Sequence, residues 1–167
     1  MKRFGLVAAL TLVCSLQARA EGLARLDFLI GEWNGTTRGE PGEGKTHRVC
    51  AKVLDERYIE CRNTTTYPAQ EKNPKGEVHV DVAYFSYDKS AKKLRLRQFH
   101  GEGFVNGYVE TDALVFETVE IENIPAGWRA RETYEQSSPN VWTERFELAE
   151  PGKNFAIYSS ATLQRVR

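Results

Sequence analysis

A histidine and a carboxylate lie two positions apart in the stretch Gln98-Phe99-His100-Gly101-Glu102, and this pair is the main candidate for chemistry. Alternate side chains of an extended strand share a face, so Gln98, His100 and Glu102 are expected on one side. A neighbouring carboxylate can fix the tautomer of an imidazole or raise its pKa. The pair is interpreted either as polar recognition groups inside a cavity or as a satisfied histidine at the edge of a sheet.

The other histidines are His47 and His79. His79 alternates with Asp81 along one segment, and these two could join His100 around a metal ion, but they follow no recognised ligand spacing. We therefore predict no metal site. The chain also lacks the G-x-S-x-G, H-E-x-x-H, P-loop and G-x-G-x-x-G motifs. No catalytic residue is predicted, and acid–base chemistry by His100 with Glu102 is kept as an alternative.

The segments that must position these residues read as strands from residue 31 to the C-terminus. Short runs rich in Val, Tyr, Phe, Thr and Arg recur, separated by Gly, Pro, Asn, Asp and Ser. Helical periodicity is absent after Ile30. About nine or ten strands are predicted, at 32–38, 46–54, 57–66, 77–87, 94–110 (with a bulge or break at its glycines), 113–122, 128–136, 141–148 and 155–166.

These strands predict an all-β fold, an up-and-down antiparallel closed β-barrel. Short turns between consecutive strands favour a meander, and closure removes exposed sheet edges. Before the first strand, residues 22–30 place apolar side chains around one or two helical turns, which predicts a short helix plugging one end. Barrels of this size usually hold one small ligand. The side chains expected to orient that ligand are Tyr84, His100, Glu102 and Tyr108.

Cys50 and Cys61 flank a predicted hairpin whose turn is Asp55-Glu56. With a two-residue turn there, residues whose numbers add to 111 lie opposite each other, which pairs the two cysteines on one face. A disulfide is predicted, and two buried free thiols are the alternative. Zinc is not favoured, because no third and fourth ligand lie nearby.

The opposite face of this hairpin is polar. It carries His47, Tyr58, Glu60 and Arg62. If it lines the lumen, the barrel interior is polar and charged; if it points outward, it is a solvated face. Strand alternation alone leaves both arrangements open.

The N-terminus has the form of a removable export signal. Met1-Lys2-Arg3 is charged, residues 4–16 are almost entirely apolar, and Ala18-Arg19-Ala20 is an A-x-A cleavage site. Lipidation at Cys14 is an alternative, although Val13 stands where that processing requires a small residue. The predicted domains are thus a signal peptide, residues 1–20, and one barrel.

The barrel domain, residues 21–167, has a weakly acidic composition. Cleavage after Ala20 removes three basic and no acidic residues from the 23 of each sign, which leaves 147 residues with a net charge of −3. Without a block of Lys or Arg, this composition argues against nucleic acid as a partner, and no second apolar run could span a membrane. We expect a secreted or periplasmic protein whose oligomeric state the sequence leaves open.

Gly31-Glu32-Trp33-Asn34-Gly35 on the first strand, together with Arg165 on the last, resembles the signature of the calycin superfamily. The resemblance implies that Trp33 packs near the closed end of the barrel against Arg165. A planar guanidinium can stack on an indole ring while it donates hydrogen bonds to carbonyls, so this pair is expected to be structural.

Three stretches carry a narrower resemblance: residues 26–33, 53–58 and 99–104. They resemble an uncharacterised family of secreted bacterial lipocalin-like domains and, more distantly, the haem-binding barrels of the nitrobindin type. Nitrobindin-like proteins hold haem through a histidine on a strand near the C-terminus. Here residues 156–162 read Ala-Ile-Tyr-Ser-Ser-Ala-Thr, and no histidine follows His100. Haem ligation is therefore not carried over, and no cofactor is predicted.

The resulting functional hypothesis is a non-enzymatic barrel that binds a small apolar or amphipathic molecule. The ligand is expected to carry a polar head group such as a carboxylate, because ligand cavities place a few polar groups to fix orientation. The alternatives are a haem-binding barrel, an isomerase or hydrolase on the same scaffold, and a cell-envelope interaction protein that binds a partner through its outer face.

Overall fold

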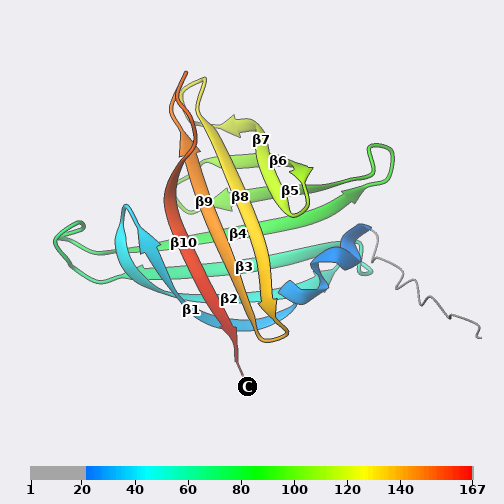
Figure 1. Cartoon of the computed structure of the whole chain (residues 1–167), viewed down its shortest axis with the longest axis horizontal. Helices are drawn as coiled ribbons and strands as arrows, with labels where there is room; N and C mark the ends of the chain where they lie inside the picture. Colours follow the sequence, from blue (N-terminus) through cyan, green and yellow to red (C-terminus); the bar gives the residue numbers. More distant parts are fainter. Residues whose placement is uncertain (1–21, 167) are drawn as a thin grey trace, which may run out of the picture.

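Within residues 22–166, which this computed structural model describes, ten antiparallel strands form a closed barrel behind one short 3-10 helix (Figure 1). The elements are η1 (Gly22–Leu29), β1 (Gly31–Gly39), β2 (Gly42–Val53), β3 (Tyr58–Tyr67), β4 (Glu77–Asp88), β5 (Lys93–His100), β6 (Val105–Asp112), β7 (Val115–Glu122), β8 (Arg129–Ser138), β9 (Val141–Ala149) and β10 (Ala156–Arg165). Each strand pairs with the next along the chain, and β1 closes the barrel against β10. The predicted all-β up-and-down barrel is confirmed. The predicted signal peptide and Cys14 lie outside the described residues.

The long segment expected at 94–110 is divided into β5 and β6 by the turn at Gly101–Phe104. Gly103 has a φ of +93°, a conformation that residues with a Cβ rarely adopt. The amide of Gly103 donates to the carbonyl of His100 at 2.9 Å, and the amide of Gly101 donates to the carbonyl of Val80 at the same distance. The glycines therefore end one strand and turn the chain back into the next.

The hairpin of β2 and β3 has the predicted register. Asp55 and Glu56 both have positive φ values, and the amide of Arg57 donates to the carbonyl of Leu54 at 3.2 Å across the turn. Cys50 then lies directly opposite Cys61, and the two form a disulfide. Both cysteines are buried in the apolar core, so the bridge links two strands from inside the barrel.

One end of the barrel is filled by apolar side chains. Leu26 and Leu29 of η1 are fully buried there, and the indole of Trp33 donates to the carbonyl of Leu29 at 2.7 Å. Arg165 pairs with Trp33 across β1 and β10, and its guanidinium carbon lies 4.1 Å from the centroid of that ring. The helix is thus joined to the core, while its role as a plug for this end stays a prediction.

The inward face of the hairpin is the one that carries the cysteines. Along β2, burial alternates with exposure from Gly42 to Cys50, so Thr46 and Arg48 point inward and His47 points outward. Glu60 and Arg62 pair with each other on the outer surface. The interior is nevertheless polar, because the cysteine face itself contributes Arg48 and, from β3, Asn63. Within residues 22–166, no helix is long and apolar enough to cross a membrane.

Candidate ligand cavity

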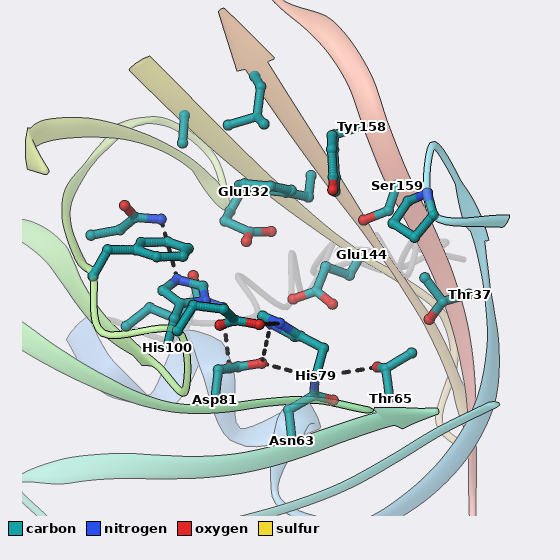
Figure 2. Close-up of a pocket in the computed structure, with 18 of the residues that line it drawn as sticks. Thr37, Asn63, Thr65, His79, Asp81, His100, Glu132, Glu144, Tyr158 and Ser159 are labelled. Carbon is teal, nitrogen blue, oxygen red and sulfur yellow. Dashed lines mark hydrogen bonds and ion pairs between the residues drawn. The ribbon is translucent and has the colours of Figure 1, made fainter. Parts of the chain in front are cut away.

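A cavity of about 600 Å³ occupies the barrel beyond the apolar core. The inward side chains along one strand divide between the apolar core and the cavity. On β3, Ile59 and Cys61 belong to the core, whereas Asn63 and Thr65 line the cavity. Toward the open end the lining contains an apolar group beside polar residues such as Thr37, Glu77 and Glu102; the apolar members are Phe104, Ile121, Ile124, Pro125, Trp128, Phe146 and Leu148. The inner part is polar and charged (Figure 2). The cavity is therefore amphipathic along the barrel.

A buried ion pair forms part of the inner wall. Arg48 donates to both carboxylate oxygens of Glu144, at 2.9 and 2.7 Å, and to Asn63 at 3.2 Å. The guanidinium also lies 5.2 Å from the ring centroid of Trp142, one layer deeper. Burial lowers the pKa of Arg48, but the charge and hydrogen bonds of Glu144 outweigh it, so the pKa is raised. Arg48 is therefore charged, and each of its three side-chain nitrogens has a hydrogen-bond partner.

Glu132 supplies a second, unpartnered carboxyl group. It is 2% exposed, and its buried Oε2 has no hydrogen-bond partner. Burial raises the pKa of Glu132 well above its ordinary value, and the nearby charge of Glu144 raises it further. Burial therefore favours the protonated form of Glu132. Figure 2 shows its carboxyl group pointing into the pocket, where it offers both a donor and an acceptor.

His79 lies between two carboxylates on the cavity wall. Its Nδ1 is 2.7 Å from Glu102 Oε1, and its Nε2 is 3.5 Å from Asp81 Oδ2. Hydrogen bonding to Asp81, and then to Glu102, raises the pKa of His79 to about 9 against the effect of burial. Burial alone would raise the pKa of Asp81. Hydrogen bonds from His79 and from two amides, together with the charge of Arg48, outweigh burial and lower that pKa. His79 and Asp81 are thus an ion pair at neutral pH.

A chain of hydrogen bonds connects Asp81 to His100 and determines which ring nitrogen of His100 carries the proton. The Asp81 carboxylate only accepts, so the Gln98 amide must donate to it, at 3.1 Å. The Gln98 carbonyl then accepts from the Tyr108 hydroxyl at 3.2 Å, and that hydroxyl accepts from Asn106 at 2.9 Å. The same Asn106 amide donates to Nε2 of His100 at 3.3 Å. In this state the proton of the neutral imidazole therefore resides on Nδ1.

His100 is held as a neutral imidazole with one free nitrogen. Burial lowers its pKa to about 4, and its ring stacks on Phe104 with centroids 4.0 Å apart. The buried Nδ1 has no hydrogen-bond partner. Glu102 does not hydrogen bond His100, because its carboxylate binds His79 instead. The charge of Glu102 raises the pKa of His100 as expected, but burial outweighs it.

Two of the four residues expected to orient a ligand, His100 and Glu102, line the cavity. Tyr108 is 1% exposed and belongs to the hydrogen-bond chain behind the wall rather than to the lining. Tyr84 is a correction: its hydroxyl donates to Glu60 on the outer surface, and its ring packs edge-on against Phe99. Its position on β4 alternates with inward Asp81 and Ala83, which directs it away from the lumen.

The sequence reasoning missed the acids of the inner wall. Glu132 alternates with Ala130 and Tyr134 on β8, and Glu144 alternates with Trp142 and Phe146 on β9. A carboxylate on the apolar face of a strand is a recognisable signal, because an unpaired buried charge is costly and therefore usually has a specific role. The same signal identifies Arg48, which alternates with Cys50.

Comparison with known proteins supports the fold. The sequence matches no known protein family and no curated protein. Its structure is similar to that of Rv2717c from M. tuberculosis, with a TM-score of 0.60 and 16% identity over 87% of this chain and 97% of that one. It is also similar to the S-type phycobiliprotein lyase CPES from Guillardia theta, with a TM-score of 0.50 and 13% identity over 85% and 90% of the two chains. Both are ten-stranded antiparallel barrels of the lipocalin-like kind, and at these identities the likeness concerns the fold alone.

Proposed function

We propose that this protein is a small-ligand-binding barrel whose ligand is amphipathic. The observation that carries the proposal is the cavity of about 600 Å³ with a polar inner wall and a group of apolar side chains toward its open end. That volume lies in the ordinary range for small-molecule sites. The polar end of the ligand lies against Glu132, whose Oε2 has no partner, and the apolar part lies against side chains such as Trp128 and Phe146.

The charges of the lining select the head group. Its acidic members are Glu77, Asp81, Glu102, Glu132 and Glu144. Among the described lining residues, the cations Arg48 and His79 are each already paired with carboxylates. An anionic head group would meet this acidic wall without a free cation, which is costly in a site of low dielectric constant. We therefore replace the carboxylate expected from the sequence with a hydrogen-bond donor, an amine or a hydroxyl group.

The test is isothermal titration calorimetry with three ligands that share one ten-carbon chain: decylamine, decanol and decanoate. Decylamine and decanol are expected to bind one per chain, with decanoate at least about tenfold weaker. Equal or tighter binding of decanoate would contradict the proposed head group. Absence of binding by all three would contradict the ligand-binding function itself.

Glu132→Gln sharpens this test, because an amide keeps one donor and one acceptor but, unlike the carboxyl group, cannot ionise when an ammonium group binds beside it. Decylamine is expected to bind about 10- to 100-fold more weakly, the equivalent of one hydrogen bond between charged groups. Decanol should change less than about threefold. The matched control is Glu135→Gln, an exposed carboxylate on the same strand, which should leave both affinities unchanged.

We also propose that the chain is exported and that its barrel folds in an oxidising compartment. The export signal in residues 1–20 motivates this proposal, and the buried Cys50–Cys61 disulfide supports it, because such bridges persist where thiols are not kept reduced. N-terminal sequencing of the protein from a periplasmic fraction should begin at Glu21. Recovery of the full-length chain from the cytosol alone would contradict export.

A haem role through the C-terminal strand is not part of this proposal. The residues of β10 that line the cavity or the core are Tyr158, Ser159, Ala161 and Leu163, and no histidine is among them. Acid–base catalysis by a His100–Glu102 pair is also set aside, since Glu102 binds His79. Ligand binding without chemistry is therefore the function that the geometry supports best.

A further inference from the structure

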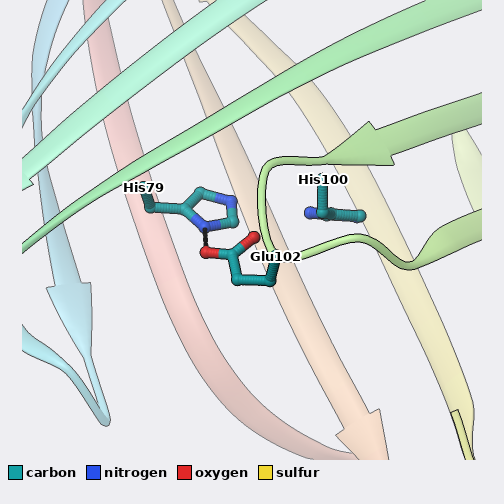
Figure 3. Close-up of side chains that lie close together, drawn as sticks. All are labelled: His79, His100 and Glu102. Atoms are coloured by element: carbon teal, nitrogen blue, oxygen red, sulfur yellow. Dashed lines mark hydrogen bonds and ion pairs between the residues drawn. The ribbon is translucent and has the colours of Figure 1, made fainter. Parts of the chain in front are cut away.

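We propose that His79, His100 and Glu102 form a binding site for one divalent metal ion, with Zn²⁺ as the best-fitting ion, on the wall of the cavity. One ligand atom from each of these residues can be chosen so that all three lie within 4.8 Å of one another. Figure 3 shows the three side chains together, with the Glu102 carboxylate extending toward His79. The site is independent of Glu132, on which the proposed ligand binding depends.

The backbone is built to bring these three side chains together. His79 and His100 lie on the adjacent strands β4 and β5, and their rings are 5.5 Å apart between centroids. The turn after His100 then returns Glu102 over His79. A Cβ on Gly101 would lie 2.8 Å from a methyl group of Val80 and 3.2 Å from its carbonyl oxygen, so a larger residue there would force Val80 to shift. The carboxylate is thus placed by the turn rather than by a flexible loop.

Groups behind the two imidazoles match the surroundings of a metal site. Metal-binding histidines usually donate the N–H of the ring nitrogen that faces away from the ion to a carboxylate, a carbonyl oxygen or a water. His79 directs Nε2 toward Asp81, which is itself held by Asn63 at 2.9 Å and by Gln98 at 3.1 Å. The Nε2 of His100 is held by Asn106. Binding an ion through Nδ1 of His100 moves the imidazole proton to Nε2, and the Asn106 amide must then turn so that its unpartnered Oδ1 accepts that proton. With this change each imidazole offers Nδ1 to the ion.

The unpartnered Nδ1 of His100 is a separate observation that points to a missing ligand. Buried polar atoms in folded proteins almost always have a partner, so an orphaned imidazole nitrogen beside a cavity requires an explanation. In the metal-free state, the His79–Glu102 hydrogen bond occupies the position between those two ligands. An ion there would satisfy His100 as well, and the acidic wall would compensate its charge.

The donor set selects the metal. Two imidazole nitrogens and one carboxylate oxygen, with a fourth position left open, are a known arrangement for Zn²⁺. Tetrahedral zinc requires its ligand atoms to be about 3.3 Å apart, so the three groups must draw together from their present separation. Glu102 Oε1 and His79 Nδ1 already lie 2.7 Å apart, so the approach that is needed is between this pair and His100. The open fourth position then faces the cavity, where water or a donor atom of a ligand completes the coordination.

The experiment uses untagged, chelator-treated protein, titrated with Co²⁺ by visible absorption and with Zn²⁺ by calorimetry. We expect one ion per chain and the intense ligand-field bands of a tetrahedral Co²⁺ complex. His79→Ala and Glu102→Gln should each weaken binding at least about 100-fold, and Asp81→Asn, behind His79, about 10- to 100-fold. His47→Ala, which removes an exposed histidine on the outer surface, should change nothing.

Binding that survives His79→Ala and Glu102→Gln but falls in His47→Ala would assign the ion to the outer surface and overturn the proposal. Absence of one-to-one binding by the wild-type protein would overturn it as well. Glu102 lies on an exposed turn, so Glu102→Gln is expected to fold, and its thermal melting curve checks this directly. Amphiphile binding by metal-free protein is measured separately, so a failure of this site leaves the proposed function standing.

Discussion

Glu132→Gln should change the pH dependence of stability as well as ligand binding. The wild-type carboxyl is buried without a partner, and its pKa is raised well above the ordinary value of 4.5. At pH values between the ordinary pKa and the raised pKa, the unfolded chain loses the proton of Glu132, whereas the folded chain retains it. Unfolding therefore releases a proton, and the wild-type protein loses stability from this group as the pH rises.

The magnitude follows from the linkage relation. Each pH unit between the unfolded and folded pKa values of Glu132 costs the wild-type protein about 1.4 kcal/mol relative to a side chain that does not titrate. The glutamine side chain that replaces it has nearly the same shape and no proton to lose. The stability of Glu132→Gln relative to wild type should therefore increase by up to about 2.7 kcal/mol between pH 5 and pH 7.

Urea unfolding followed by tryptophan fluorescence, at pH 5, 6 and 7 with the disulfide intact, measures this difference. The control is Glu135→Gln on the exposed side of β8, whose difference from wild type should stay flat across the same range. A flat difference for Glu132→Gln would show that Glu132 ionises normally. The reasoning about a protonated group in the cavity would then be refuted.

Two further predictions concern the buried charges and the closed end of the barrel. Arg48→Met leaves the buried Glu144 carboxylate without its bidentate partner. Urea unfolding at pH 7 should therefore show that the free energy of unfolding falls by about 3–5 kcal/mol, and the double variant with Glu144→Leu should recover most of this loss. A loss below about 1 kcal/mol would show that the pair is hydrated. Trp33→Ala should cost about 3–5 kcal/mol and Arg165→Ala less. Because their side chains stack, these two losses should be non-additive in a double-mutant cycle, and strict additivity would contradict the contact.

Much of the fold could be predicted because strand alternation and turn residues are local signals. The two-residue turn at Asp55-Glu56 sets the register of its hairpin, and that register pairs Cys50 with Cys61. Glycines predicted the break between β5 and β6. Trp33 and Arg165 are neighbours because the first and last strands of a closed barrel must pair.

The site was harder to predict because the usual hydrophobic pattern is inverted around the cavity. On β4, Val78 and Val80 are 62% and 44% exposed, while His79 and Asp81 face the lumen. A pattern that assigns apolar side chains to the interior therefore assigns this strand the wrong way round. Such inversions arise where a barrel encloses a polar space, so they are themselves a sign of a functional cavity.

The partner of Glu102 could not be predicted from spacing. Strand alternation places Glu102 beside His100, but β5 ends at His100 and the glycine turn redirects the chain. The carboxylate consequently reaches His79 on the neighbouring strand, 23 residues away in sequence. The contact depends on how two strands and a turn are arranged in space, which residue types alone do not specify.

The central claim is that the cavity holds an amphipathic molecule with its polar end inward. A crystal structure of the protein with 10-bromodecylamine tests it most directly, because the bromine atom gives an anomalous signal that marks the end of the chain. We predict the bromine peak beside Trp128 and Phe146, and the ammonium group within hydrogen-bond distance of Glu132. A bromine peak at the inner wall, or on the outside of the barrel, would contradict the account.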